Sequence, residues 1–167
     1  EHVERLRRAA SGAGLALEFS EEDLLEQARA LFRSNGVSEG VFKIVVSDAG
    51  DGPLVAVFVR SRGTVGVAQP VRLTVSAVVK ASQAFTSRHK STNYMESTLE
   101  LEKAKAAGFD ECVFLNERGH VTECAISNLF WARGDTLFTS DLRCGLLDGI
   151  VRAQVLEIAT ELGLPTE

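Results

Sequence analysis

Two helical patterns open the chain. In residues 1–15, apolar side chains recur three or four positions apart, and two glycines mark the end of that helix. Residues 19–36 repeat the pattern: Ser20 is a favourable N-cap, three acidic residues follow it in the positive first turn, and Gly36 ends the helix. No capping residue precedes Glu1, so we expect the chain to begin within a helix.

The pattern then changes to runs rich in β-branched residues. Segments 41–47, 54–60 and 71–79 have this composition, and clusters of turn residues such as DAGDGP separate them. Two helices followed by what resembles an antiparallel meander predict a small α+β lobe over residues 1–79.

Residues 80–92 have weak periodicity and many small polar side chains, so we expect a linker between two lobes. Residues 93–167 are expected to form part of a larger lobe. Its expected elements are a helix over 93–107, strands over 110–116, 120–126, 128–132 and 136–140, and a helix over 149–163. The predicted fold class is α+β, with a small α+β N-lobe and a larger C-lobe in which helices flank a mixed or antiparallel sheet.

Composition and charge narrow the class of protein. The 167 residues are 45% hydrophobic and 25% charged with a net charge of −5, which fits a globular chain and excludes disorder, collagen and coiled coil. No apolar run approaches the roughly 20 residues of a membrane helix, and no Lys/Arg cluster favours nucleic acid or an anionic membrane as partner. Three unpaired cysteines and three scattered histidines predict neither disulfides nor a metal site, and no signal-peptide pattern is present, so we expect a reducing cytoplasm.

Lys90 is the first candidate for chemistry. It closes the predicted linker, directly before a helix, in the segment RHKSTNYM. A lysine that forms a Schiff base needs a lowered pKa and a fixed position, and a crossing between two lobes can provide both. The alternative is a solvated linker lysine.

Glu123 and a pair of glycines are the other candidates. Glu123 lies within the apolar segment HVTECAISNLFW, where a carboxylate is costly unless a cation or a protonated group such as a pyridinium nitrogen faces it. The alternative is strand alternation, with Glu123 in solvent. Gly145 and Gly149 precede the last helix, whose first N–H groups could bind a phosphate, although a plain glycine turn is the alternative.

Three segments, taken in this order, carry a family resemblance. RHKSTNYM, VTECAISNLFW and CGLLDGIVR are similar to the class IV aminotransferases, the fold-type IV pyridoxal-phosphate enzymes, and the match runs from about His89 to the C-terminus. EHVERLRR and EGVFKIVVS resemble the family more weakly. The resemblance implies a fold-type IV architecture, pyridoxal 5'-phosphate as cofactor, a small amino-acid-like substrate and a homodimer.

The resemblance also implies roles for four residues near the ring of the cofactor. Lys90 is the residue that carries the cofactor as a Schiff base and then acts as general base. Tyr94 lies near the phenolic oxygen, and Glu123 pairs with the pyridine nitrogen. Asn128 matches the asparagine of the same motif.

Five further residues take roles by the same resemblance. Leu147 lies beneath the ring, and Ile150 and Val151 bind the phosphate through their backbone amides. Val151 replaces the threonine that is usual in the family, so a hydroxyl contact is lost. Cys124 and Ala125 are expected on the substrate side.

The resemblance is incomplete, and it leaves the reaction open. Family members carry an upstream arginine that clamps the phosphate and segments beyond the last helix, so we expect this chain to be truncated at both ends. Cys124 and the SNLFW stretch resemble the aminodeoxychorismate lyases, which release 4-aminobenzoate and pyruvate in folate synthesis. The alternatives are a transaminase for branched-chain or D-amino acids, and a truncated homologue without catalytic activity.

Overall fold

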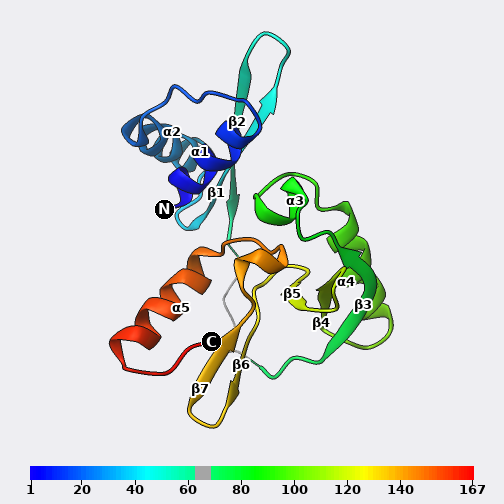
Figure 1. Cartoon of the computed structure of the whole chain (residues 1–167). Helices are drawn as coiled ribbons and strands as arrows, with labels where there is room; N and C mark the ends of the chain where they lie inside the picture. Colours follow the sequence, from blue (N-terminus) through cyan, green and yellow to red (C-terminus); the bar gives the residue numbers. More distant parts are fainter. Residues whose placement is uncertain (63–68) are drawn as a thin grey trace. The chain divides into compact units, whose positions relative to one another are not determined.

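The computed structural model describes residues 1–62 and 69–167 (Figure 1). The chain falls into two compact units, Glu1–Ala68 and Gln69–Glu167. In the described ranges, no helix combines the length and the apolar composition needed to cross a membrane. All the candidate residues named above belong to the second unit.

The first unit combines two helices with a β-hairpin. Its elements are α1 (His2–Gly12), α2 (Glu21–Ser34) and the antiparallel strands β1 (Gly40–Asp48) and β2 (Pro53–Ser61). The predicted N-cap of α2 is confirmed, because Ser20 Oγ accepts a hydrogen bond from Asp23 N and Asp23 Oδ2 accepts one from Ser20 N, both at 3.0 Å. This capping box satisfies two backbone N–H groups and fixes the start of the helix.

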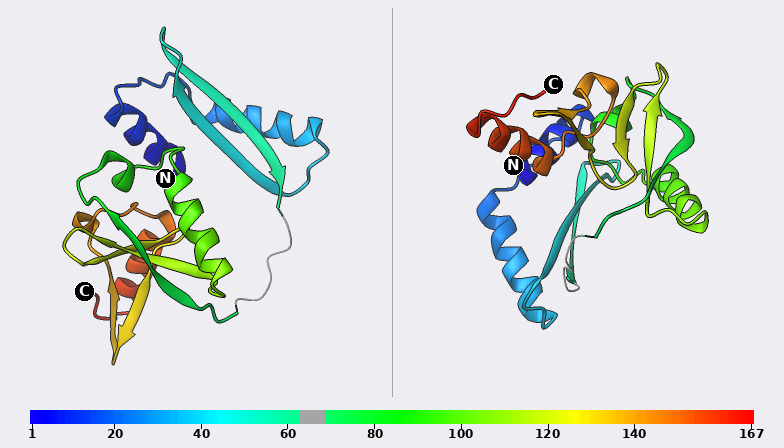
Figure 2. Two further views of the ribbon diagram at one scale, coloured as in Figure 1. Left: turned by 90° about the vertical axis from the view of Figure 1, so that its right-hand side faces the viewer. Right: turned by 90° about the horizontal axis from the view of Figure 1, so that it is seen from below.

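The second unit is built around a mixed sheet. Its elements are β3 (Leu73–Lys80), α3 (Phe85–Arg88), α4 (Met95–Ala106), β4 (Glu111–Asn116), β5 (Val121–Cys124), β6 (Phe130–Arg133), β7 (Thr136–Thr139), the short 3-10 helix η1 (Leu142–Cys144) and α5 (Ile150–Glu161). Strand β4 is central, parallel to β3 and antiparallel to β5, while β6 and β7 form a separate antiparallel pair. Figure 2 shows α4 beside this sheet, as its contacts with β3 and β4 require.

The core of the second unit lies where α4 covers β4. Ala104 of α4 packs with Cys112 and Phe114 of β4, and all three side chains are buried. Strand β4 is buried along nearly its whole length, which explains its continuous apolar run CVFL. The loops that follow β3, β4 and β5 are therefore attached to a rigid centre.

Strand β3 corrects the predicted meander. It does not continue the β1–β2 hairpin but pairs with β4 in parallel, with Leu73 opposite Glu111 and Val75 opposite Val113. The first unit consequently ends at Ala68 rather than at 79, and residues 80–92 lie inside the second unit instead of linking two lobes. Apolar alternation marks a strand but not its neighbour, and the α4 crossover makes a parallel pairing possible.

Gly145 provides a test of the close packing in this unit. Its φ is +83°, and a Cβ there would collide with the backbone of Ser82, whereas a Cβ at Gly119, with φ +75°, would meet nothing within 4 Å. We expect Gly119→Ala to cost about 1 kcal/mol of unfolding free energy through its backbone conformation alone. Gly145→Ala should cost roughly 1–3 kcal/mol more, because the two backbones must separate. Urea unfolding of both variants measures the difference, and equal losses would contradict the close approach.

Candidate active site

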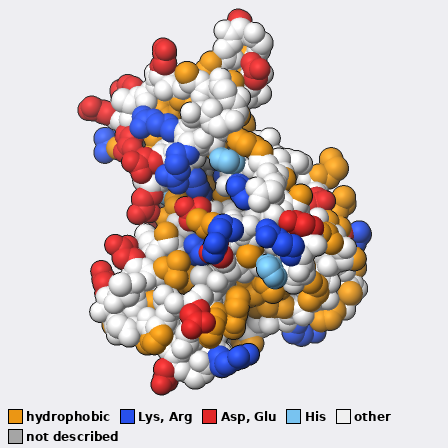
Figure 3. Space-filling view, viewed as in Figure 1, with side chains coloured by type: hydrophobic (Ala, Val, Ile, Leu, Met, Phe, Trp, Pro, Cys, Tyr) orange, Lys and Arg blue, Asp and Glu red, His pale blue; other side chains and the backbone are white. Residues whose placement is uncertain are grey.

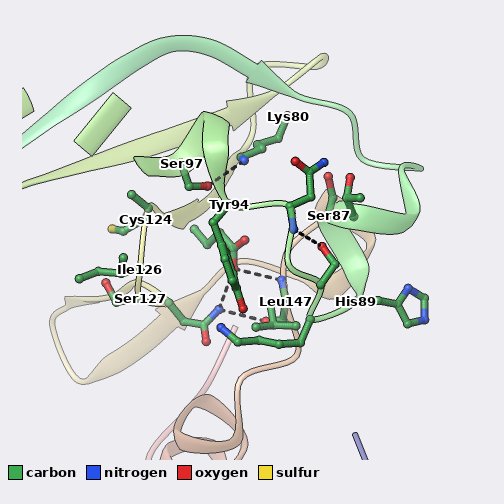
Figure 4. A pocket seen from close by; sticks show the side chains of 16 residues that line it. Lys80, Ser87, His89, Tyr94, Ser97, Cys124, Ile126, Ser127 and Leu147 are labelled. Carbon is green, nitrogen blue, oxygen red and sulfur yellow. Dashed lines mark hydrogen bonds between the residues drawn. The ribbon is translucent and has the colours of Figure 1, made fainter. Parts of the chain in front are cut away.

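One pocket of the second unit gathers seven of the nine predicted site residues. Lys90 and Tyr94 reach it from the segment between α3 and α4, Glu123 and Asn128 from β5 and the turn after it, and Leu147 from the turn before α5 (Figure 4). Cys124 and Ala125 line the same pocket, while Ile150 and Val151 lie in the first turn of α5 and not in the lining. Three segments far apart in sequence therefore meet at one place.

The Lys90 side chain lies over an aromatic ring. Its Nζ is 5.1 Å from the centre of the Tyr94 ring, within the range of a cation–π interaction. Figure 4 shows the Tyr94 ring across the middle of the pocket and His89 directed away from it. The His89 ring instead stacks on Phe85 with a centroid distance of 4.1 Å, and its backbone N–H closes α3 on Phe85 O at 2.9 Å. The residue before Lys90 is thus fastened to α3.

Glu123 points into the pocket rather than to solvent. Its Oε2 accepts hydrogen bonds from Leu147 N at 3.0 Å and from Asn128 Nδ2 at 3.4 Å. Burial raises the pKa of its carboxyl, and the Leu147 bond and the charges of Lys80 and Lys90 oppose that rise. Within the described ranges no lysine or arginine forms an ion pair with Glu123.

Asn128 joins the Glu123 side of the pocket to the start of α5. Its Nδ2 donates to Leu147 O at 3.1 Å, so Glu123 and Asn128 together hold the N–H and the carbonyl of one residue. A Cβ on Gly149 would strike the Asn128 amide, which is why glycine is required at that position. Gly149 is also the N-cap of α5 and contributes no side-chain hydrogen bond to the first turn of that helix.

Sequence reasoning missed Lys80. This lysine lines the pocket, its side chain is only 16% exposed, and its Nζ lies 4.3 Å from the centre of the Phe114 ring. Nζ donates hydrogen bonds to Ser97 Oγ at 3.2 Å and to Glu96 Oε2 at 3.1 Å. The available signal was a lysine closing an apolar strand, VSAVVK, but its inward direction depends on the parallel pairing of β3.

The wall with Cys124 and Ala125 is rigid and unreactive. Burial raises the pKa of the Cys124 thiol to about 11, so the thiol is neutral at pH 7 and a poor nucleophile. Buried Glu111 accepts hydrogen bonds from three backbone N–H groups, those of Cys112 at 2.9 Å and of Ala125 and Ile126 at 3.2 Å. A charged group with three such bonds holds the turn after β5 in one conformation.

The donor set is unlike a metal centre. Across the residues that the structure describes, no three His, Cys, Asp or Glu side chains lie close enough together to hold a metal ion. The polar side chains that line the pocket carry amines, hydroxyls, amides, one imidazole (His89), one thiol (Cys124) and one carboxylate (Glu123).

The whole chain, residues 1–167, matches the family amino-transferase class IV, and the protein therefore belongs to that family. Over 98% of its length it is 28% identical to an aminodeoxychorismate lyase of Bacillus subtilis (strain 168), of which it covers 60%. It is 27% identical to a branched-chain-amino-acid aminotransferase of Salmonella typhimurium, covering 98% of this chain and 58% of that protein. The chain thus spans about 60% of the length of these relatives.

Solved structures resemble the chain over almost all of its residues. A provisionally named 4-amino-4-deoxychorismate lyase of Legionella pneumophila has a TM-score of 0.89 at 25% identity, covering 98% of this chain and 63% of the other. A branched-chain aminotransferase of Thermoproteus uzoniensis with norvaline has a TM-score of 0.86 at 30% identity, covering 99% of this chain and 60% of the other. The family and the fold class that the sequence predicted are both confirmed.

The buried carboxyl of Glu123 predicts a pH-dependent stability. Its raised pKa means that, between the ordinary value of 4.5 and the raised value, the folded protein binds more protons than the unfolded chain. Stability should therefore fall as the pH rises through this window in protein prepared without cofactor. Glu123→Gln keeps an acceptor for Leu147 N but cannot ionise, so it should be more stable than wild type at neutral pH and lose that advantage in acid.

Urea unfolding from about pH 4 to about pH 8 measures this dependence. Glu102→Gln is the control, because the Glu102 side chain is 64% exposed on α4. Parallel stability curves for wild type and Glu123→Gln would contradict a buried carboxylate at this position.

Proposed function

We propose that the protein is a pyridoxal-phosphate enzyme in which Lys90 binds the cofactor covalently. The observation that carries the proposal is the meeting of Lys90, Tyr94, Glu123 and Leu147 in one pocket, with no ion pair on the Glu123 carboxylate in the described part of the chain. The family uses this cofactor, and a structure similar to the chain, an aminotransferase at 27% identity, holds N-(5'-phosphopyridoxyl)-L-glutamate.

The residues present fit the chemical groups of the cofactor. The Glu123 carboxylate suits a protonated pyridine nitrogen, since a positive partner offsets the cost of its burial. The backbone N–H groups of Ile150 and Val151 lie at the positive end of α5, which suits a phosphate. Leu147 supplies an apolar surface for a ring, and Tyr94 a hydroxyl for the phenolic oxygen.

Each residue then has a definite part in the chemistry. Pyridoxal phosphate, when bound, draws electrons from the substrate carbon that bears the amino group. The Lys90 amine would act as general base, taking the proton from that carbon and returning it at another atom. The Glu123 carboxylate would hold the ring nitrogen of the cofactor, while Asn128 and Leu147 hold Glu123 in place.

We further propose that the reaction is the lyase reaction on aminodeoxychorismate, giving 4-aminobenzoate and pyruvate. The pocket supports a polar substrate, because hydroxyl and amide side chains form much of its lining: Thr86, Ser87, Ser91, Asn93, Ser97 and Ser127. The 28% identity to an aminodeoxychorismate lyase agrees with this choice. The second candidate is a branched-chain transaminase, which the 27% identity to such enzymes favours.

We also propose that two copies of the chain associate. Apolar side chains are exposed on neighbouring elements of the second unit, Val75 and Val79 on β3 and Met95 and Leu99 on α4. Figure 3 shows hydrophobic side chains on this side of the unit. A contiguous apolar surface is unusual on a monomer and is typical of an interface. Sedimentation at micromolar concentration tests the association.

Replacement of Lys90 tests the cofactor assignment. Wild type should develop a visible absorption band with pyridoxal phosphate, and borohydride should then fix a pyridoxyl group on the peptide that contains Lys90. Lys90→Ala should lose both signals and at least about 10²–10⁴-fold in turnover, since the general base is gone. Lys105→Ala is the matched control, because Lys105 lies on α4 and pairs with Glu102 at 2.9 Å. This variant should keep both the absorption band and the pyridoxyl label. Equal labelling of Lys90 and Lys105 would contradict a dedicated site and would favour a non-catalytic homologue.

The products distinguish the two candidate reactions. Incubation with aminodeoxychorismate should release 4-aminobenzoate and pyruvate in equal amounts, with the cofactor spectrum restored after each turnover. Leucine, isoleucine, valine and D-alanine should leave the spectrum of the bound cofactor unchanged. A lasting spectral change with a branched-chain amino acid, together with release of its 2-oxo acid, would instead establish the transaminase.

A further inference from the structure

Ser82 is a buried contact point just beyond the pocket. Its backbone N–H and its Oγ both donate to the carboxylate of Glu117, at 2.9 Å and 2.5 Å. Its carbonyl accepts a hydrogen bond from Arg88 Nε at 2.9 Å, and its backbone packs directly on Gly145. Ser82 is only 1% exposed, although the Glu117 side chain that holds it is half exposed. We call Ser82, Glu117 and Gly145 the Ser82 anchor.

The register of the sheet explains why the anchor forms. Lys80 and Asn116 are partners at the ends of the parallel strands β3 and β4. The segments that follow β3 and β4 leave the sheet at the same edge. Ser82, two residues after β3, and Glu117, one residue after β4, therefore lie side by side. Asn116 adds the third segment, because its Nδ2 donates to Cys144 O at 3.1 Å, next to Gly145.

Each segment of the anchor leads directly to part of the candidate active site. From Ser82 the chain runs through α3 to Lys90, and the Arg88 bond ties the end of α3 back to Ser82. From Gly145 it runs to Leu147, which Glu123 and Asn128 hold, and then to the start of α5. The anchor thus joins the segment that carries the reactive amine to the segment that offers N–H groups to a phosphate.

We propose that Glu117 is a positioning residue that, through Ser82, sets Lys90 at a fixed place relative to the first turn of α5. This inference rests on the proposed function, because it gives Lys90 and α5 their roles toward one cofactor. Glu117 itself lies outside the pocket lining. The cofactor is a rigid ligand that would be bound covalently at one end and through its phosphate at the other. Lys90 and the first turn of α5 must therefore both be correctly placed at the same time.

The charge state of Glu117 supports this role. The hydrogen bonds from Ser82 lower the pKa of its carboxyl to about 2, with a smaller contribution from Arg118, whose Nε lies 3.7 Å from Oε1. Glu117 is therefore ionised under all ordinary conditions and accepts both bonds at once. Arg118 Nη2 also donates to Ser82 Oγ at 3.3 Å, so the hydroxyl is held from two sides.

Two forms of the cofactor separate positioning from folding. Pyridoxal phosphate engages Lys90 covalently, whereas pyridoxamine phosphate offers the same ring and phosphate without that bond. Glu117→Gln, which can accept only one of the two Ser82 bonds, should bind pyridoxal phosphate about tenfold more weakly and pyridoxamine phosphate nearly as well as wild type. Ser82→Ala should behave in the same way, and Glu102→Gln should match wild type for both. Equal weakening of both forms, or no weakening, would overturn the proposal.

Amide hydrogen exchange of the cofactor-free chain gives a second readout that needs no bound ligand. Glu117→Gln should speed exchange in residues 83–90 and in residues 145–150 together, because both segments lose the same anchor. Faster exchange confined to residues 116–120 would overturn the proposal. If wild type binds neither cofactor form, the proposed function fails and this inference fails with it. Faster exchange in both residues 83–90 and residues 145–150 would then show only that the Ser82 anchor connects these two segments.

Discussion

The buried carboxylate of Glu123 is the constraint on which the rest of the site depends. A carboxylate taken out of water is costly unless charges or N–H groups replace its hydration. Here one backbone N–H, that of Leu147, makes the principal bond, and Asn128 makes a longer one. That bond also fixes the turn before α5, so the same interaction that orients Glu123 determines where the helix begins. The segment that carries Glu123 and the turn before α5 therefore stabilise each other's conformation.

The parallel pairing of β3 and β4 brings the remaining parts together. Because the two strands end at the same edge, the Lys90 segment, the turn after β4 and the turn before α5 converge beside one another. Two of the contacts are close approaches to a glycine: the Ser82 backbone lies against Gly145, and the Asn128 side-chain amide lies against Gly149. Such contacts tolerate no extra atom, and they give loops the precision that a catalytic group requires.

The sequence predicted local structure better than it predicted pairing. The N-cap at Ser20, the four long helices α1, α2, α4 and α5 and the apolar run of β4 follow from short-range patterns, and the structure has them; the short helix α3 was not predicted. The partner of β3 depends on a contact between residues about 38 positions apart, as Leu73 and Glu111 are, and no local pattern encodes it. Lys90 and Glu123 became strong candidates only through the family resemblance, since the local sequence also allowed each to be a solvent-exposed side chain. Lys80 and Glu117 were missed because their directions follow from the β3–β4 pairing.

The charges around the pocket differ in sign from the protein as a whole. The chain carries a net charge of −5, but the pocket is lined by Lys80, Lys90 and a single carboxylate, Glu123. Lysines in a recess attract anions, although Glu96, at 3.1 Å from Lys80 Nζ, offsets part of the Lys80 charge. A phosphate ester and a substrate with carboxylate groups are both anions of this kind. Hydrogen bonds to Glu96 and Ser97 and the contact with the Phe114 ring hold the Lys80 ammonium in one position at the wall of the pocket. The charges of the pocket therefore agree with the proposed function, in which the cofactor and the substrate both carry anionic groups.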